Sequence, residues 1–318
     1  MTIKGILPIV KPAGMTSHDV VRFIRKALNI QRVGHTGTLD PDATGVLIIL
    51  IGKATRLMQF MVNLPKAYVA EVVLGITTDT LDASGEILSE IKDVKIPKER
   101  FVEALSGFRG QIAQVPPMVS AVHYKGQRLY SLARRGIEVP REVRKVHIYE
   151  LMVRKWPEND PLVSKDRVLI SIRCSSGTYV RQLVSDIGDY LGCGAHVGLL
   201  CRTEVGDIDM ASCHSLDEIK AAISDGSFCN KILPISTGLS HLPTVILDEY
   251  DHSVMKKLST GARIHLGDLK SPIRNLHEEQ VKEGDLIGVI TSSGSTVCVV
   301  KVRTIQNTIY LQPFVVFV

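Results

Sequence analysis

The sequence has no apolar run long enough to cross a membrane. Its longest uninterrupted hydrophobic stretch among the candidate strands, residues 46–51, holds six residues, whereas a membrane-spanning helix needs about 20. The N-terminal stretch carries Lys4 but is interrupted by Pro8 and Pro12 before any signal-peptide core could form. We therefore expect a cytoplasmic protein that does not span a membrane.

Paired cysteines are also missing. None of the six cysteines lies in a C-x-x-C pair, so reduced and mostly buried thiols are expected. One group was tested as possible zinc ligands: Cys193, His196, Cys201, Cys213 and His214. Its spacing matches no common zinc pattern, and Cys201 lies in an apparent strand. The sequence favours ordinary core and loop residues, and no metal site is predicted.

The net charge of +5 is modest, but it is unevenly distributed. Residues 244–318 hold eight basic and eight acidic residues, so the whole excess lies in residues 1–243. Residues 121–145 alone hold seven basic and two acidic residues. Such a segment would attract a phosphate backbone, but charge runs are also common on solvated helix faces. Composition alone leaves both interpretations open.

The chain length of 318 residues predicts one large domain and a small one. Thr16 and Asp19 form a capping box that predicts a helix. Residues 46–51 read as a buried strand, and residues 167–173 alternate in the manner of a half-buried strand. Strands outnumber helices without regular βαβ alternation, which indicates a mixed α+β fold. Beyond residue 244, strand-like runs suggest a small β-barrel.

The loop 34–45 reads GHTGTLDPDATG, with three glycines and a proline. This composition predicts tight turns that would hold Asp40 rigidly beside a buried strand. A calcium loop starting at Asp40 fails, because Ile51 would stand where a bidentate Glu is required. A phosphorylated-aspartate enzyme would need phosphate-binding loops that the sequence lacks. A catalytic carboxylate and an aspartate that caps a turn both remain possible on the residues alone.

Five blocks of sequence carry a family resemblance. They read KPAGMTSHDVV at 11–21, GHTGTLDPDATGVL at 34–47, KAYVAEVVLGITTDTLDASGEI at 66–87, QVPPMVSAVHYKGQRLYSLARRGIEVPR at 114–141 and CSSGTYVRQLVSDIGDYLGCGAHVGLL at 174–200. In this order they resemble the TruB family of tRNA pseudouridine synthases, and they cover most of residues 5–205. Residues 244–318, with KEGDLIGVI, look like the PUA domain that many members carry.

The resemblance implies the architecture. We expect a mixed, largely antiparallel sheet in a catalytic domain at residues 1–235, with an RNA-clamping insertion at about 121–145. A linker at 236–243 and a PUA-like RNA-binding β-barrel at 244–318 would follow. Guide-RNA-dependent relatives lack a comparable insertion. Its presence therefore implies a stand-alone monomer that needs no guide RNA or protein partner.

The resemblance also implies the reaction, which is isomerisation of uridine 55 in the T loop of tRNA to pseudouridine. The base is flipped out, its N1–sugar bond is broken, and it is rejoined through C5. Nothing is oxidised and no energy is supplied, so no cofactor or metal is expected. Asp40 aligns with the catalytic aspartate, and Arg181 aligns with the arginine that keeps it ionised in a desolvated site. Tyr68 aligns with the tyrosine that lies against the base and can move a proton.

Other residues are assigned by the same resemblance to RNA binding or to support of the site. His35 aligns with a histidine that enters the RNA loop, and Tyr179 and Leu200 align with residues that line the base pocket. Cys201 stands where an arginine often follows the pocket leucine. The basic residues expected to bind RNA are Lys125, Arg128, Arg134, Arg135 and Arg141. The expected supporting residues are Lys11, Pro12 and Asp82.

A second function stays open. The basic insertion and the PUA-like region would also suit a tRNA-binding or folding factor in which catalysis is secondary. The sequence does not decide whether Asp40 attacks the sugar or the base, or promotes elimination.

Overall fold

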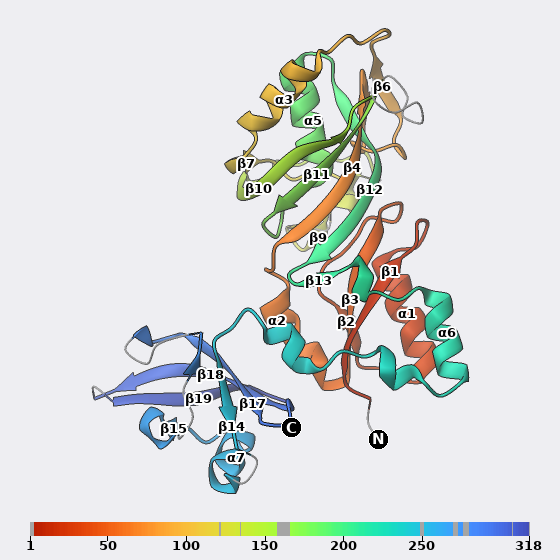
Figure 1. Ribbon diagram of the computed structural model, residues 1–318. Coiled ribbons are helices and arrows are strands. Elements are labelled where there is room, and N and C mark those ends of the chain that lie inside the picture. The colour runs from red at the N-terminus through yellow and green to blue at the C-terminus, as the bar shows by residue number, and fades with distance from the viewer. Residues whose placement is uncertain are drawn as a thin grey trace.

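The computed structural model describes residues 3–120, 122–133, 135–157, 166–248, 251–269, 273–275, 280–306 and 308–317. Its strands form a nine-stranded sheet, a six-stranded sheet and two small two-stranded sheets (Figure 1). The predicted class, mixed α+β with largely antiparallel pairing, is confirmed. In spatial order the first sheet contains β1 (Gly5–Lys11), β3 (Thr44–Ile51), β12 (Ala195–Val205), β4 (Lys66–Leu74), β11 (Arg167–Cys174), β10 (Arg144–Lys155) and β7 (Gly110–Gln114), with β2 (Val33–His35) on β3 and β13 (Ile208–Asp209) on β12.

The nine-stranded sheet consists of two halves joined by β12. The first half-sheet holds β1, β2 and β3, and the second holds β4, β11, β10 and β7. Strand β12 pairs with β4 in antiparallel fashion over most of its length, but it meets β3 in a short parallel contact. That contact registers two residue pairs, Cys201 with Thr44 and Arg202 with Gly45. Any site built from both halves therefore depends on this narrow join.

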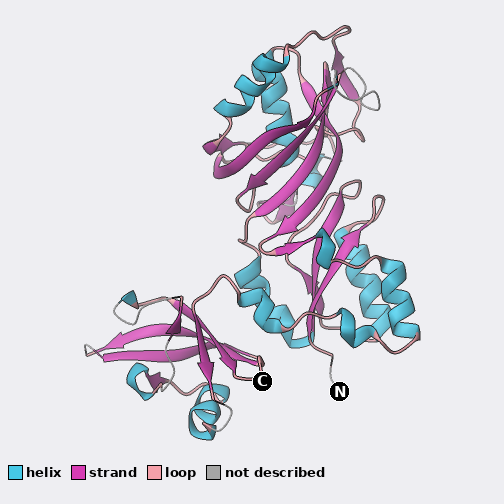
Figure 2. Cartoon of the chain, viewed as in Figure 1, coloured by secondary structure: helices cyan, strands magenta, loops and turns pink. Residues whose placement is uncertain are grey.

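Helices cover each half-sheet. Helices α1 (Ser17–Leu28) and α6 (Leu216–Ser224) lie beside the first half, and α3 (Lys98–Gly107) and α5 (Val180–Leu191) lie beside the second (Figures 1 and 2). The predicted capping box is confirmed at the start of α1. The Asp19 backbone N–H donates to Thr16 Oγ1 at 3.1 Å, and the Thr16 N–H donates to the Asp19 carboxylate at 3.0 Å. The helix buries Val20, Val21 and Ile24.

The six-stranded sheet curls beside α7 (His252–Ser259), in keeping with a PUA-like fold. Its spatial order is β15 (Ile264–His265), β19 (Thr308–Val316), β18 (Thr296–Ile305), β17 (Leu286–Thr291), β14 (Thr244–Leu247) and β16 (Ile273–Arg274). The short elements elsewhere are η1 (Gly52–Leu57), α2 (Met58–Met61), β5 (Ile76–Thr78), β6 (Ile87–Glu90), β8 (His123–Tyr124), β9 (Gln127–Arg128), α4 (Leu129–Ala133), η3 (Met210–Ser212), η4 (Phe228–Lys231), η5 (Ile235–Leu239) and η6 (Leu266–Asp268).

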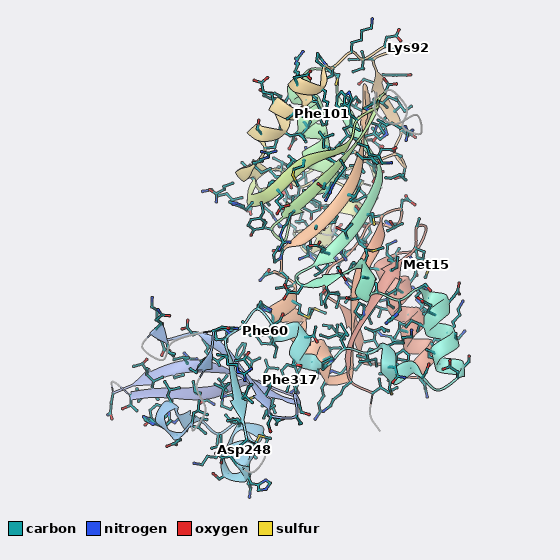
Figure 3. The ribbon with its side chains drawn as sticks, in the orientation of Figure 1. Met15, Phe60, Lys92, Phe101, Asp248 and Phe317 are labelled. Atoms are coloured by element: carbon teal, nitrogen blue, oxygen red, sulfur yellow. The ribbon has the colours of Figure 1, made fainter. Side chains whose placement is uncertain are left out.

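An apolar junction connects the two sheets. Phe60 of α2 lies edge-on to Phe314 of β19, with ring centroids 6.3 Å apart. Phe317, next to β19, is fully buried at the same place (Figure 3). Leu239 of η5 joins this cluster, so the segment 236–243 packs against both sheets. Within the described part of the chain, no helix is both long and apolar enough to span a membrane.

Candidate active site

Asp40 lies in the loop between β2 and β3, and the residues around it are anchored in the core. Leu39 and Ala43 are both buried. The Leu39 backbone N–H donates to the Ser17 hydroxyl at 2.8 Å, and that hydroxyl donates back to the Leu39 carbonyl at 3.2 Å. A turn follows, in which the Ala43 N–H donates to the Asp40 carbonyl at 3.2 Å. The loop therefore presents its carboxylate from a fixed backbone.

Lys11 supports this loop from beneath. Its side chain is fully buried, and Nζ donates to the carbonyl oxygens of Pro12 at 2.7 Å, Met15 at 2.7 Å and Pro41 at 2.8 Å. Three ammonium hydrogens thus meet three acceptors, one of them next to Asp40. Burial lowers the pKa of Lys11 to about 8, against the opposing attraction of the nearby carboxylates Asp42 and Asp40.

Arg181, in the first turn of α5, holds the Asp40 carboxylate with two nitrogens. Its Nε lies 3.0 Å from Asp40 Oδ2, and its Nη2 donates to Asp40 Oδ1 at 3.1 Å. This bidentate pair is the strong geometry for a guanidinium and a carboxylate. Arg181 is only 4% exposed, while the Asp40 side chain remains 41% exposed. The arginine is therefore a fixed support, and the carboxylate keeps one open side.

The other hydrogens of Arg181 fix the guanidinium to two more segments, one containing Thr80 and Asp82 and the other Val119. It donates to the carbonyls of Thr80 at 2.8 Å and Val119 at 2.9 Å, and Nη1 lies 3.3 Å from Asp82 Oδ2. Asp82 is itself held, because its Oδ1 accepts from Thr80 Oγ1 at 2.7 Å and from the Ser84 N–H at 3.1 Å. Two carboxylates thus share one cation.

Burial raises the pKa of Asp40 above its ordinary value. The charge of Arg181 opposes this shift, the second carboxylate of Asp82 adds to it, and Lys11 opposes it. Since burial disfavours the charged form, the bidentate contact with Arg181 is the interaction that favours an ionised Asp40 at neutral pH.

A pocket of about 180 Å³ opens beside this pair. Asp40, Asp82 and Arg181 line its polar side, and Val197, Gly198 and Leu200 of β12 line another. The volume is below the roughly 300–1,000 Å³ of sites for drug-sized ligands, so it suits one small ring. A lining that combines apolar side chains with a carboxylate suits a planar ring with polar edges.

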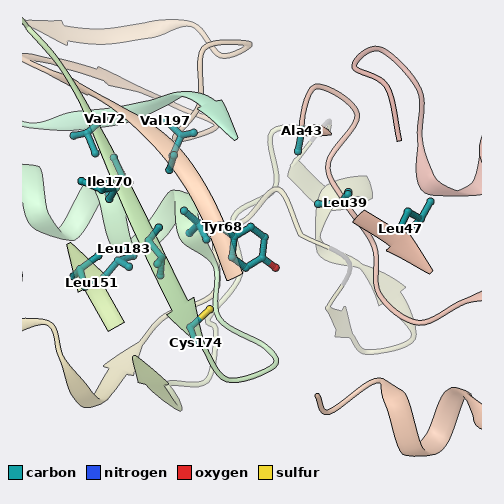
Figure 4. Packing of buried hydrophobic residues seen from close by; sticks show 14 of the residues in the cluster. Leu39, Ala43, Leu47, Tyr68, Val72, Leu151, Ile170, Cys174, Leu183 and Val197 are labelled. Carbon is teal, nitrogen blue, oxygen red and sulfur yellow. The ribbon is translucent and has the colours of Figure 1, made fainter. Parts of the chain in front are cut away.

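Three of the other expected site residues lie outside the lining of this pocket. Tyr68 is buried in β4, with its hydroxyl directed toward the loop that carries Leu39 and Ala43 (Figure 4). Burial raises the pKa of the Tyr68 phenol. Tyr179 directly precedes α5, where the buried Gln114 side chain holds its backbone N–H at 2.8 Å and its carbonyl at 3.1 Å.

His35 ends β2 and is half-buried. Its Nδ1 has no hydrogen-bond partner among the described residues, and burial together with the charge of Arg202 lowers its pKa. The ring is therefore neutral in this environment, which suits stacking better than ion pairing.

The basic segment forms a hairpin, β8–β9, followed by α4. Lys125 stands in the hairpin turn with its ammonium 5.5 Å from the centre of the Tyr124 ring. Arg135 donates to Gln127 at 2.5 Å, and Arg141 pairs with Glu138 at 3.1 Å. Arg128 is exposed on β9, and Arg134 lies outside the described residues. The segment begins just after Val119, whose carbonyl contacts Arg181.

Sequence reasoning missed Arg202, although it noted the neighbouring Cys201. Arg202 is 2% exposed, and it donates to the carbonyls of Val46 at 2.8 Å, Gly37 at 3.0 Å and Thr38 at 3.3 Å. A charged residue within a strand of otherwise mixed pattern gives no signal of this role, because the acceptors are backbone atoms about 160 residues upstream.

The candidate zinc ligands do not come together as a metal site. Across the described ranges, no group of three or more His, Cys, Asp or Glu side chains is placed to hold a metal ion. Cys193 and His196 are buried in the second half-sheet region, and Cys213 follows η3.

Comparison with known proteins gives consistent matches. The family model described as "TruB family pseudouridylate synthase (N terminal domain)" matches residues 25–180, and that of the "tRNA pseudouridylate synthase B C-terminal domain" matches residues 181–240. A tRNA pseudouridine synthase B from Moorella thermoacetica is 42% identical over 302 residues, which cover 95% of this chain and 94% of the relative. One from Clostridioides difficile is 41% identical over 261 residues, covering 81% and 83% of the two chains.

Solved structures also match. A chain in an H/ACA RNP bound to a substrate RNA containing 2′-deoxyuridine superposes with a TM-score of 0.75 at 25% identity. A chain in a Cbf5–Nop10–Gar1 complex gives 0.74 at 26% identity. Each match covers 99% of this chain and 85% of the other.

Proposed function

The chain belongs to the TruB family of pseudouridylate synthases, and from this premise we propose that it converts uridine 55 in the T loop of tRNA to pseudouridine. Asp40 is the proposed catalytic carboxylate. The observation that carries this proposal is the Asp40–Arg181 pair, with its open carboxylate edge facing a pocket for one small ring.

The chemistry requires a carboxylate that is ionised yet poorly solvated. The reaction breaks the N1–C1′ bond, turns the uracil and forms a C5–C1′ bond, while C5 loses a proton and N1 gains one. A desolvated carboxylate is a stronger nucleophile or base, but desolvation alone would neutralise it. Arg181 supports the ionised form through two contacts and is itself too buried to be displaced by solvent. Tyr68 is the proposed second group, able to carry a proton near the base.

The size of the pocket favours an extruded base over a stacked one. A nucleotide within an RNA stack cannot reach Asp40, so the uridine has to flip out at a cost of a few kcal/mol. We propose that Leu200 supports one face of the flipped uracil, that Tyr179 borders it, and that His35 fills space in the RNA loop left by the base. Lys11, Pro12 and Asp82 would support the loop and the arginine without reacting.

RNA binding is assigned to basic and C-terminal parts of the molecule. Lys125, Arg128, Arg134, Arg135 and Arg141 would contact phosphates of the T arm, whose loop shape supplies specificity. We propose a catalytic domain at residues 1–235, a linker at 236–243 and a PUA-like domain at 244–318. The proposed enzyme is a cytoplasmic monomer that uses no cofactor, metal, guide RNA or obligatory protein partner.

The proposal is tested with an unmodified tRNA transcript and purified protein. Pseudouridine should form at position 55 without any added cofactor, and Asp40→Asn should lower the single-turnover rate by about 10⁴-fold or more. Asp217→Asn, which alters an exposed ion pair with Lys220, should keep the parent rate. A transcript left unmodified by the parent protein would refute the proposal.

The same variants address the tRNA-binding alternative, which the basic hairpin favours. If Asp40→Asn lacks activity but restores growth of a strain deleted for the gene, tRNA binding is the main cellular task. If Asp40→Asn fails to restore growth although it still binds tRNA, modification of tRNA is the main cellular task.

A further inference from the structure

The active site spans the join between the two half-sheets. Asp40 comes from the loop that leads into β3 of the first half, whereas Tyr68 lies on β4 of the second half and Arg181 on the helix that covers it. The direct link between β3 and β12 is the short parallel contact of two registered pairs. The distance from Asp40 to the other site residues therefore depends on how firmly this join is held.

Arg202 lies at the centre of the join. On β12 it is registered with Gly45 of β3 on one side and with Tyr68 of β4 on the other. Its side chain then crosses to the first half-sheet, where its three nitrogens donate to the carbonyls of Gly37, Thr38 and Val46. These carbonyls bracket Asp40 on both sides in the sequence. One guanidinium thus fixes both ends of the Asp40 loop to the second half-sheet.

The backbones at this point approach so closely that a side chain would not fit. Gly45 has φ +103°, and a Cβ there would lie 2.1 Å from the Arg202 carbonyl oxygen. Glycine is therefore required at position 45. The close approach brings the guanidinium within reach of three carbonyls, and each accepts from a different nitrogen of its planar fork. A lysine would present all of its hydrogens from one nitrogen, so it cannot reproduce this spread of donors.

The charge of Arg202 is compensated in an unusual way. It is 2% exposed, and among the described residues no carboxylate forms an ion pair with it. Backbone carbonyl dipoles take the place of a counter-ion. A buried unpaired charge is costly, so the surrounding polar groups have to be held in place for the fold to tolerate it.

Arg202 also lies beside Tyr68 in the sheet, where the two residues are registered partners, and its charge lowers the pKa of the Tyr68 hydroxyl against the larger effect of burial. Figure 4 places that hydroxyl on the side of the Asp40 loop. Arg202 therefore connects the strand that carries Tyr68 with the loop that carries Asp40.

We propose that Arg202 is a positioning residue, which holds the Asp40 loop in register with Tyr68 and Arg181. This inference rests on the proposed function and goes beyond it by naming the group that sets the geometry across the join. Arg202 touches no substrate atom in this account.

The test compares Arg202→Lys with Arg173→Lys. Arg173 lies on β11 in the same sheet and pairs with Glu204 in a half-exposed ion pair. With a T-arm RNA and saturating enzyme, Arg202→Lys should lower the single-turnover rate constant by about 10²-fold, the effect expected of a misplacement near 1 Å. Its Kd for the RNA should stay within about twofold, and Arg173→Lys should match the parent in both.

The rate constant separates positioning from a loss of folded protein. A purely structural defect lowers the fraction of enzyme that reacts, and leaves the rate constant of the folded fraction unchanged. An Arg202→Lys variant that reacts at the parent rate constant would overturn the inference, whatever its melting temperature. So would a variant whose loss lies wholly in the Kd.

A second variant covers the case in which Arg202→Lys does not fold. A Cβ at Gly37 would lie 3.7 Å from Arg202 Nη1, an ordinary contact with no unusual φ. Gly37→Val therefore crowds the guanidinium without removing it. It should lower the rate constant with little change in Kd, and a parent rate constant would contradict the inference. If the parent protein makes no pseudouridine, the proposed function fails. If the parent is active and both variants react with the same rate constant as the parent, the proposed function stands and the positioning role of Arg202 fails.

Discussion

The partly exposed Asp40 loop and the apolar junction between the two sheets are held by different interactions. Around Asp40, three buried cations donate to backbone carbonyls and to the carboxylate at 2.7 to 3.3 Å. At the junction, apolar side chains such as Phe60, Phe314 and Phe317 pack against one another. Hydrogen bonds are directional and fix atoms in place, whereas apolar burial supplies free energy with little directional demand.

This difference separates geometry from stability. Each hydrogen bond adds only about 1 kcal/mol net to the free energy of unfolding, and the burial of cations lowers that free energy. A buried aromatic side chain contributes several times more. We therefore expect substitutions around Asp40 to change the reaction rate more than the melting temperature, and substitutions at the junction to do the reverse.

Among the residues that hold Asp40 in place, the largest effect is expected from Arg181→Met. Without the guanidinium, the largest effect that opposes burial is lost and only Lys11 still lowers the pKa of Asp40, so the carboxylate is neutralised over a wider pH range. The single-turnover rate at neutral pH should fall by about 10³-fold. Arg167→Met, which breaks a more exposed pair with Glu71 on the same sheet, is the control and should keep the parent rate. A loss below about tenfold for Arg181→Met would contradict the role given to this pair.

A smaller effect is expected from pH, through Lys11. Below its pKa of about 8 the ammonium has three hydrogens for three carbonyls, and above it the amine has two. Loss of one contact should lower the rate by about tenfold as pH rises through this region. At low pH the rate should fall again as Asp40 becomes protonated. Because the pKa of Asp40 is raised, this fall should occur above the ordinary aspartate value of about 3.9.

The stability contribution of Lys11 has the opposite sign. Its pKa is lower in the folded protein than the value of about 10.4 in an unfolded chain, so its charged form opposes folding. That opposition declines as pH rises from about 8 to about 10.4. Over this pH range, the single-turnover rate should therefore fall while the destabilising effect of Lys11 on the fold also declines. A pH–rate profile and a pH series of melting curves, each compared with Lys11→Met, measure the two trends; parallel trends would count against the assignment.

The smallest effect on the rate is expected from Phe317→Ala, at the junction. Removal of this fully buried ring should lower the free energy of unfolding by about 3–5 kcal/mol. With a T-arm substrate, the single-turnover rate should stay within about twofold of the parent, because the substitution lies outside the Asp40 network. Urea unfolding and the same rate assay provide the comparison. A large loss of rate in a folded variant would show that the junction also sets the geometry of the site.

The two regions also differ in how far the sequence could predict them. Local signals were sufficient for the helix cap at Thr16 and Asp19, because its partners are three residues apart. The contact between Asp40 and Arg181 joins residues 141 positions apart, and only a family resemblance brought them together. No local pattern identifies the carbonyl acceptors of Lys11 or Arg202, since any residue supplies a carbonyl.

The sequence also could not predict which of the expected RNA-binding side chains line the pocket beside Asp40. The sequence assigned Tyr68, Tyr179 and His35 to contact with the RNA, while the structure places all three outside the lining of the pocket beside Asp40. Their roles depend on how an RNA loop lies on the surface. The basic segment was visible as charge, but its engagement in local contacts, such as Arg141 with Glu138, depends on the fold.

The most direct test is a crystal structure of the protein with a T-arm RNA that carries 5-fluorouridine at the target position. The account predicts a flipped fluorinated base in the pocket, its ring against Leu200 and its edge or sugar in contact with the Asp40 carboxylate, with Arg181 still paired to that carboxylate. A target base that remains stacked in the RNA loop, or lies in a pocket remote from residue 40, would contradict it.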